Sequence, residues 1–119
     1  MGESIDDRVD LALALRELAV DSIPVNLFNP RVGTPLEKMP RLTALEALRA
    51  FAMFRMVNPC TDIRAAGGRE ICLGPLQPLA LFAVNSIFAE GYLTTTGQGH
   101  ARDLEMIKSL GFEVGSIEA

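Results

Sequence analysis

An alternation of helical and strand-like segments, joined by short connections, constrains the fold of this chain more than any other feature. Apolar residues spaced as on one face of a helix alternate with short, mostly apolar runs that are bounded by Gly, Pro and Asn. The predicted order is a helix over 5–19, a strand over 22–28, a helix from Thr43 to the stop at Asn58-Pro59, a strand over 61–66, a short helix within 76–84, a strand over 86–89 and a helix over 101–110. Such alternation indicates right-handed βαβ units and a parallel sheet.

Capping residues locate the helix ends. Ser4 precedes two carboxylates that suit the positive first turn of a helix, and Thr43-Ala-Leu-Glu46 has the pattern of a capping box. Gly111 is placed to end the last helix in a left-handed conformation. The expected apolar faces are Ile5, Val9, Ala12, Leu15, Leu18 and Ala19 on the first helix, and Leu45, Leu48, Phe51, Ala52 and Met56 on the second.

The arrangement favours a partial (βα)₈ barrel of the TIM type. No Gly-x-Gly-x-x-Gly follows the first strand, which argues against a dinucleotide-binding fold. With 119 residues the chain is one domain at most, about half of the roughly 250 that an intact barrel needs. Three parallel strands would leave two open edges. We therefore expect a half-barrel over 1–119 that pairs with a copy of itself, as a dimer, or with a separate N-terminal half-barrel.

Composition excludes several classes of function. The net charge is −4 and no run of Lys and Arg occurs, which disfavours nucleic acid and anionic membranes as partners. No window holds 18 consecutive apolar residues, and the first residues lack the basic and apolar regions of a signal peptide. Cys60 and Cys72 are too few for a disulfide framework or a zinc site, and His100 is the only histidine. A reducing, cytoplasmic setting is expected.

Two polar side chains in the predicted strands are candidates for function. Asn26 lies between Val25 and Leu27, and its amide suits either a urea, amide or carboxylate on a ligand or an internal hydrogen bond to the turn after the next strand. Arg64 precedes four small residues, and Arg is rarely buried without a partner. It suits either an anionic ligand or an ion pair with a carboxylate such as Asp62 or Glu70.

Two glycine-containing turns are weaker candidates. Gly67-Gly68 and the loop over 94–99 (TTTGQG) each precede a helix, where backbone amides can bind an anion. Ordinary turn formation and helix capping are the favoured explanation for both. The hypothesis that the chain is a phosphate-binding barrel fragment of unrelated function therefore depends on these glycines alone.

Several segments in register resemble biotin synthase. They follow one another with matching order and spacing across nearly the whole chain. The segments are GES at 2–4 with Asp7-Arg8, IPVNL at 23–27, GTPL at 33–36, IRAAGGRE at 63–70, LQPL at 76–79, NSIF at 85–88, YLTT at 92–95, DLEMI at 103–107 and LGF at 110–112.

The resemblance implies a radical SAM (βα)₈ barrel that inserts sulfur into dethiobiotin, using S-adenosylmethionine, a 4Fe–4S cluster and a 2Fe–2S cluster. On this basis Asn26 would lie near dethiobiotin, and Phe28-Asn29 would pass near the adenosyl group. Arg64 matches the family's arginine ligand to the 2Fe–2S cluster, with Ser86 placed to orient it.

The chain departs from the family in its cysteines. The Cys-x-x-x-Cys-x-x-Cys motif that holds the 4Fe–4S cluster does not occur in it, and Cys60 and Cys72 match none of the family's cluster ligands. We therefore expect the C-terminal half of such a barrel, from the helix after the fifth strand through the eighth strand, without cofactors or catalysis of its own. The alternatives are a self-associating binding or assembly module and a subunit that completes a barrel with a separately encoded N-terminal half.

Overall fold

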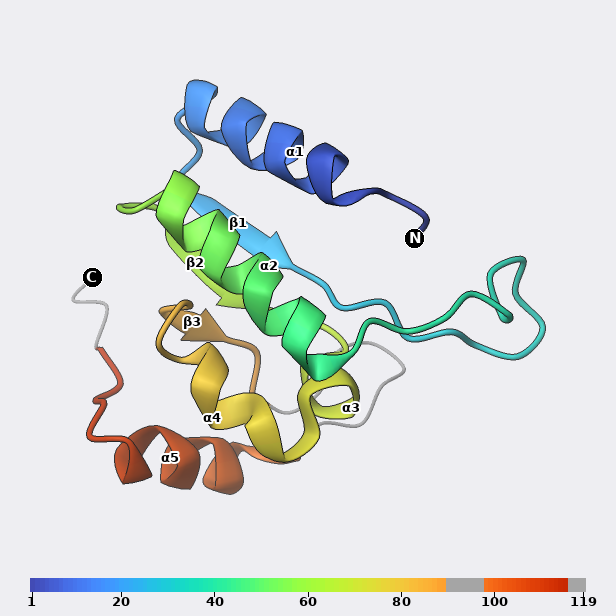
Figure 1. Ribbon diagram of the computed structural model, residues 1–119. Coiled ribbons are helices and arrows are strands. Elements are labelled where there is room, and N and C mark those ends of the chain that lie inside the picture. The colour runs from blue at the N-terminus through green and yellow to red at the C-terminus, as the bar shows by residue number, and fades with distance from the viewer. Residues whose placement is uncertain (90–97, 116–119) are drawn as a thin grey trace.

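The computed structural model describes residues 1–89 and 98–115, and it has the alternating order of helices and strands expected from the sequence (Figure 1). The elements are α1 (Ile5–Glu17), β1 (Ser22–Val25), α2 (Ala44–Val57), β2 (Asp62–Ala65), α3 (Arg69–Leu73), the 3₁₀ turn η1 (Gly74–Leu76), α4 (Gln77–Ala80), β3 (Ser86–Ile87) and α5 (His100–Ser109).

The three strands form one parallel sheet in the order β1-β2-β3. Ile23 pairs with Ile63, and Arg64 pairs with Pro24 on one side and with Ser86 on the other. This α/β arrangement with an open, three-stranded parallel sheet confirms the coarser part of the fold prediction. It is compatible with part of a barrel.

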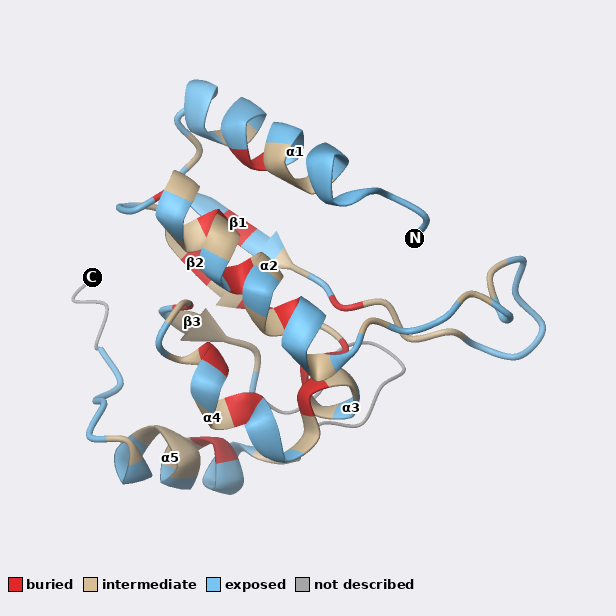
Figure 2. Ribbon diagram, viewed as in Figure 1, coloured by how far each residue is buried: buried red, intermediate tan, exposed pale blue. Residues whose placement is uncertain are grey.

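The two faces of the sheet differ in character, because successive strand residues point to opposite sides. Ile23, Ile63 and Ala65 are buried in the core together with Phe51 and Phe54 of α2 (Figure 2). α2 lies across this face, and α1 packs beside α2 (Figure 1). The opposite face carries polar side chains, and a hydrogen bond between Ser22 Oγ and Asp62 Oδ2 (3.4 Å) joins two of them. The core therefore lies on one side of the sheet only.

The predicted caps are confirmed. Ser4 forms a reciprocal capping box with Asp7, and Thr43 forms one with Glu46. Gly111 has φ 77° and follows α5 directly after Leu110, as expected for a left-handed stop.

The strands are shorter than the sequence indicated. β1 was expected to run to Phe28, but it ends at Val25. Beyond this point the Leu27 N–H donates to the Gly67 carbonyl, and the Asn26 side chain accepts the Gly67 N–H. β2 and β3 likewise cover 62–65 and 86–87 where 61–66 and 86–89 were expected.

The helices also differ from the prediction in places. The prediction placed a single short helix within 76–84 and missed α3, which begins directly after Gly68. On α2 the predicted apolar face was wrong at three positions: Leu45 and Met56 are 55% and 83% exposed, and Ala52 is exposed as well. The buried residues of this helix are Ala47, Phe51 and Phe54. Apolar residues occur around much of this helix, so periodicity alone could not choose the side that meets the sheet. The same holds at the ends of α1, where Ile5 and Leu18 are exposed.

Within the described ranges 1–89 and 98–115, no helix is both long and apolar enough to cross a lipid bilayer.

Candidate functional site

Arg64 lies on the open face of the sheet, in the middle of β2. Its Nε donates a hydrogen bond to Ser86 Oγ on the neighbouring strand (2.8 Å), which is the contact that the resemblance implied. Its Nη2 lies 3.6 Å from Asp62 Oδ2, the ion pair left open as the alternative interpretation. About a third of the side chain remains exposed, and Nη1 makes no hydrogen bond within the described residues. Arg64 therefore keeps donors that a further group can use.

The ring of Phe88 forms a platform for the guanidinium. The Arg64 Cζ atom lies 5.3 Å from the ring centroid, within the range of a cation–π interaction. Phe88 directly follows β3, and no property of its own in the sequence singled it out. The contact depends on how far the chain continues past the short strand, which only the folded structure determines.

A cavity of about 540 Å³ adjoins Arg64 and runs along β3 to the segment after α5. Asp62, Arg64 and Ser86 give it a polar wall, while Ile107, Phe112 and Val114 contribute an apolar one. A guanidinium with free N–H donors beside such a cavity can bind a carboxylate, another anion or a neutral acceptor.

Asn26 lies at the carboxyl end of β1 and is exposed, which corrects the expectation of an amide enclosed in an apolar strand. Its Oδ1 accepts a hydrogen bond from the N–H of Gly67 (3.0 Å), and the Leu27 N–H donates to the Gly67 carbonyl (2.8 Å). This is the internal bond that the sequence left open as the alternative to a ligand contact. The Asn26 NH₂ group makes no hydrogen bond in the part of the chain that the structure describes, so half of the amide is available.

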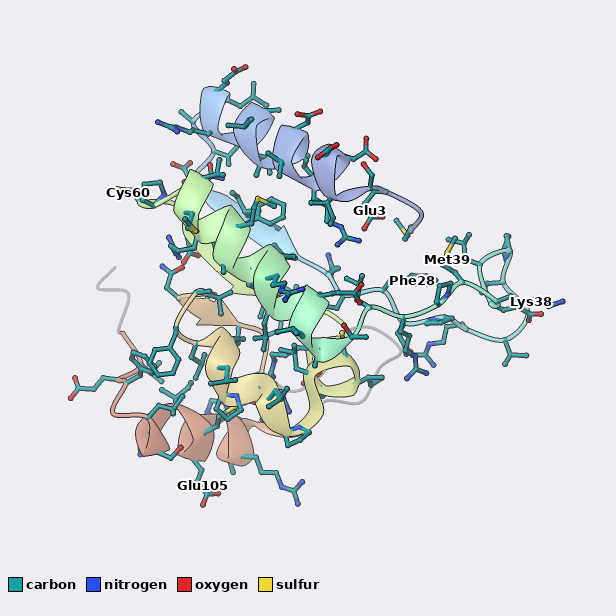
Figure 3. All side chains as sticks on the ribbon, viewed as in Figure 1. Glu3, Phe28, Lys38, Met39, Cys60 and Glu105 are labelled. Atoms are coloured by element: carbon teal, nitrogen blue, oxygen red, sulfur yellow. The ribbon has the colours of Figure 1, made fainter. Side chains whose placement is uncertain are left out.

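Phe28 and Asn29 follow at the start of the long connection to α2, and both are half-buried (Figure 3). The Oδ1 atom of Asn29 is buried without a hydrogen-bond partner among the described residues. A buried polar oxygen without a partner costs free energy, so this position suits a donor from outside the described part of the chain. No contact joins these two residues to Arg64 in the structure.

The cysteines lie apart from this site. Cys60 is exposed at the end of the sheet opposite to Phe28 (Figure 3). Cys72 is half-buried, its thiol points to the Leu42 carbonyl (3.4 Å), and desolvation raises its pKa, so the protonated thiol is favoured over the thiolate that binds metals. Among residues 1–89 and 98–115, no group of three or more His, Cys, Asp or Glu side chains could hold a metal ion.

Of the two glycine turns, Gly67-Gly68 is explained by close packing. Gly68 has φ 84°, and a Cβ atom there would lie 1.9 Å from the Leu27 carbonyl oxygen. In the loop over 94–99, Thr94 to Gly97 lie outside the described residues. His100 is exposed at the first position of α5.

A buried polar cluster around Arg69 was not predicted from the sequence. Its guanidinium contacts Asp103 of α5, Gln77 of α4 and the Phe88 carbonyl. One signal was present in the sequence: Asp103 shares a helical stripe with Met106, Ile107 and Leu110, and a carboxylate on an apolar stripe needs a buried partner.

The chain is similar in sequence to known proteins over nearly its whole length. A family-wide sequence profile, Biotin and Thiamin Synthesis associated domain, matches residues 24–113, and the chain belongs to this family. Among curated proteins it is 55% identical over 118 residues to biotin synthase of Salinibacter ruber, covering 99% of this chain and 33% of that protein. It is 54% identical to biotin synthase of Gloeothece citriformis and 53% identical to that of Staphylococcus aureus, over 97% and 96% of this chain and 32% and 34% of theirs.

The predicted resemblance to the C-terminal portion of biotin synthase is thereby confirmed. The chain spans about a third of the length of the curated relatives that it matches.

Proposed function

We propose that this chain forms the C-terminal part of a closed (βα)₈ barrel that makes biotin from dethiobiotin, and that it supplies one wall of the active site. The observation that carries the proposal is the open face of the sheet, where Arg64 is fixed by Ser86 and retains free donors beside a cavity of about 540 Å³. A barrel places such a face toward its interior, and its active site at the carboxyl ends of the strands. Asn26, at the carboxyl end of β1, is then a contact for the urea-like head of the substrate.

The described residues do not suffice for an iron–sulfur cluster. Such clusters need several thiolates, whereas Cys60 lies at the opposite end of the sheet and the pKa of Cys72 is raised by burial. Arg64 fits as one contact to a cluster whose thiolates come from another segment. We therefore assign no step of the sulfur chemistry to this chain alone, and we propose that it does not form biotin by itself.

The proposed role of Arg64 and Asn26 is to bind and orient. Arg64 presents a planar, permanently charged group whose direction is set by the Ser86 hydrogen bond and the Phe88 ring. Asn26 has its oxygen engaged by Gly67, so its NH₂ group is the one that remains for an acceptor on the substrate. The orphaned Asn29 oxygen supports a further contact near Phe28, where the resemblance implies the adenosyl group.

The experiment is reconstitution with the missing part of the barrel. The chain is co-expressed with the N-terminal two-thirds of the Salinibacter ruber biotin synthase, supplied with iron and sulfide under anaerobic conditions, and assayed for biotin with reductant, dethiobiotin and S-adenosylmethionine. We expect a stable complex that forms biotin, and no product from either part alone. Product from the 119-residue chain alone, or two parts that do not associate, would contradict the proposal.

Arg64→Met in the reconstituted complex is expected to change the visible absorption of the 2Fe–2S cluster while leaving association intact. Arg49→Met is the matched control, because Arg49 is an exposed arginine of α2, remote from the open face. If the two variants have equal spectra, Arg64 does not contact the cluster.

A second candidate function is a self-associating binding module. Within residues 1–89 and 98–115, β1 and β3 each pair with another strand on one side only, and this supports the module, since an unpaired strand edge readily pairs with another chain. Light scattering on the purified chain, alone and mixed with the N-terminal part, distinguishes the two functions. A dimer that persists in the mixture favours the binding module. A complex of the chain with the N-terminal part favours the barrel.

A further inference from the structure

Arg69 is a buried cation at the carboxyl end of the sheet, and nothing in the proposed function accounts for it. Its side chain is 1% exposed, and that of Asp103, its counterion on α5, is 2% exposed. The Arg69 Nη2 atom lies 3.0 and 3.1 Å from the two Asp103 carboxylate oxygens. Gln77 accepts a hydrogen bond from Nη1, and Gln98 donates one to Asp103, so the pair is enclosed by further polar side chains.

One contact of Arg69 leads out of this cluster. Nη2 also donates to the backbone carbonyl of Phe88 at 3.1 Å. Its two hydrogens are shared among Asp103, Glu70 and this carbonyl, and the carbonyl is the acceptor that belongs to the chain leaving β3. Arg69 therefore ties the residue after β3 to the start of α3 and to α5.

Phe88 connects the buried cluster to the open face. While its carbonyl is held by Arg69, its ring lies against the Arg64 guanidinium, 5.3 Å from Cζ to the centroid. The Ser86 hydrogen bond holds the Nε end of Arg64, and the Asp62 carboxylate lies 3.6 Å from Nη2. The Phe88 ring is the contact that lies against the guanidinium itself, and it restricts the plane in which the free Nη1 donor lies.

We propose that Arg69 is a positioning residue for Arg64: by holding the Phe88 carbonyl, it fixes the ring against which the Arg64 guanidinium lies. The inference deepens the proposed function, because it concerns the direction of the Arg64 donors in the site assigned there. A buried ion pair often stabilises a protein no more than apolar residues of the same volume. What Arg69 adds that an apolar residue lacks is a directional bond to one particular carbonyl.

The test observes Arg64 directly, by side-chain ¹H–¹⁵N NMR of the full 119-residue chain. Its Nε–Hε resonance is identified as the one that disappears in Arg64→Lys. The double variant Arg69→Met, Asp103→Leu removes both buried charges together, so no unpaired ion is left behind. We expect the Arg64 Hε to lose its ring-current shift and to exchange with solvent about tenfold faster, as when a side chain loses a fixing contact.

Asn58→Ala is the control for loss of stability. Asn58 is buried and donates to the Ala12 and Phe54 carbonyls, tying α1 to α2 on the covered side of the sheet. Asn58→Ala is expected to destabilise the chain but to leave the Arg64 resonance unchanged. If lower stability by itself shifted the resonance, Asn58→Ala would shift it too. Phe88→Leu is expected to reproduce the double variant, and adding it to the double variant should change the resonance no further.

Two results would overturn the proposal: an Arg64 resonance unchanged by the double variant, or one that moves equally in Asn58→Ala. If the double variant does not fold, the same comparison uses Arg69→Gln, Asp103→Asn, whose amides can bond each other while the shorter side chain falls short of Phe88. If neither double variant folds, Arg69 is required for folding and not for positioning Arg64, and this too would overturn the proposal. Because no cluster or partner is present in this measurement, its failure is distinct from a failure of barrel reconstitution.

Discussion

Arg64 lies within β2 and Arg69 follows the strand by a few residues, yet their surroundings differ. Arg69 is buried with its charge matched by Asp103 of α5, and both of its Nη groups donate to other groups of this chain, while its Nε has no hydrogen-bond partner among the described residues. Arg64 lies on the open face, a third exposed, with one hydrogen bond, a looser ion pair at 3.6 Å and donors to spare.

The difference teaches how to separate a structural arginine from a functional one. A guanidinium is costly to bury, so one whose counterion and Nη partners come from this chain stabilises a particular arrangement of the chain. One that is held in direction but left with free donors beside a cavity is prepared for a group from elsewhere. Substitutions at these positions should therefore affect different properties: stability in the buried cluster, and binding on the open face.

The largest loss in the free energy of unfolding is expected from Gly68→Ala. Gly68 lies in the turn directly before Arg69 and so determines where the Arg69 side chain enters the buried cluster. A Cβ atom at this position meets the Leu27 carbonyl oxygen at 1.9 Å, and φ is 84°. Overpacking against backbone and a left-handed alanine together should cost about 4–6 kcal/mol, enough to prevent folding of a small domain.

Gly33→Ala is the matched control for Gly68→Ala. Gly33 also has a positive φ, 81°, but no atom lies within 4 Å of the added Cβ. Only the conformational cost of about 1 kcal/mol remains. Urea unfolding followed by circular dichroism compares the two, and equal losses would show that the close approach at Leu27 is not a constraint.

Arg69→Met should follow, with a loss of about 3–5 kcal/mol in the free energy of unfolding. It leaves the Asp103 carboxylate buried without its counterion, which costs more than the ion pair contributed. The urea midpoint measures the effect. A loss below about 1 kcal/mol in the free energy of unfolding would mean that water reaches the cluster. The two arginines would then not differ in their contribution to stability.

Arg64→Met should change stability by less than about 1 kcal/mol, because a partly exposed ion pair contributes little. Its effect should be seen on binding and on the cluster spectrum of the reconstituted barrel. A stability loss as large as that of Arg69→Met would contradict the assignment of Arg64 to a site.

The smallest effect is expected on the pH dependence of stability, and it compares two carboxylates in place of two arginines. Whereas Asp103 is buried, Glu46 is exposed at the amino end of α2, where hydrogen bonds from the Thr43 side chain and then its backbone N–H hold the Glu46 pKa below its usual 4.5. The ionised form is thus favoured by folding, so its contribution is complete above pH 4.5 and is lost as the pH falls through the lowered pKa.

Glu46→Gln should therefore reduce the difference in urea midpoint between neutral and acidic pH. Glu105→Gln is the control, since Glu105 is exposed and points from α5 away from the rest of the molecule (Figure 3). If both variants keep the full acid dependence, the capping box does not contribute to it.

The sequence by itself determined the order of elements, both capping boxes, the stop at Gly111 and the parallel sheet, because each depends on neighbours within a few residues or on the spacing of apolar side chains. Asn26 and Arg64 were found because a polar residue in a short strand is conspicuous. The resemblance gave them candidate roles and added Ser86.

Only the tertiary structure decided which side of α2 meets the sheet, that Asn26 binds the Gly67 turn, and that Arg69, Asp103 and Phe88 form a path to Arg64. Asp103 is 34 residues from Arg69, and Phe88 is 19 residues away. No local pattern pairs such side chains, since their contact depends on how α5 and the chain after β3 pack against the end of the sheet. Burial then makes the pairing obligatory, because a guanidinium removed from water must find its acceptors within reach.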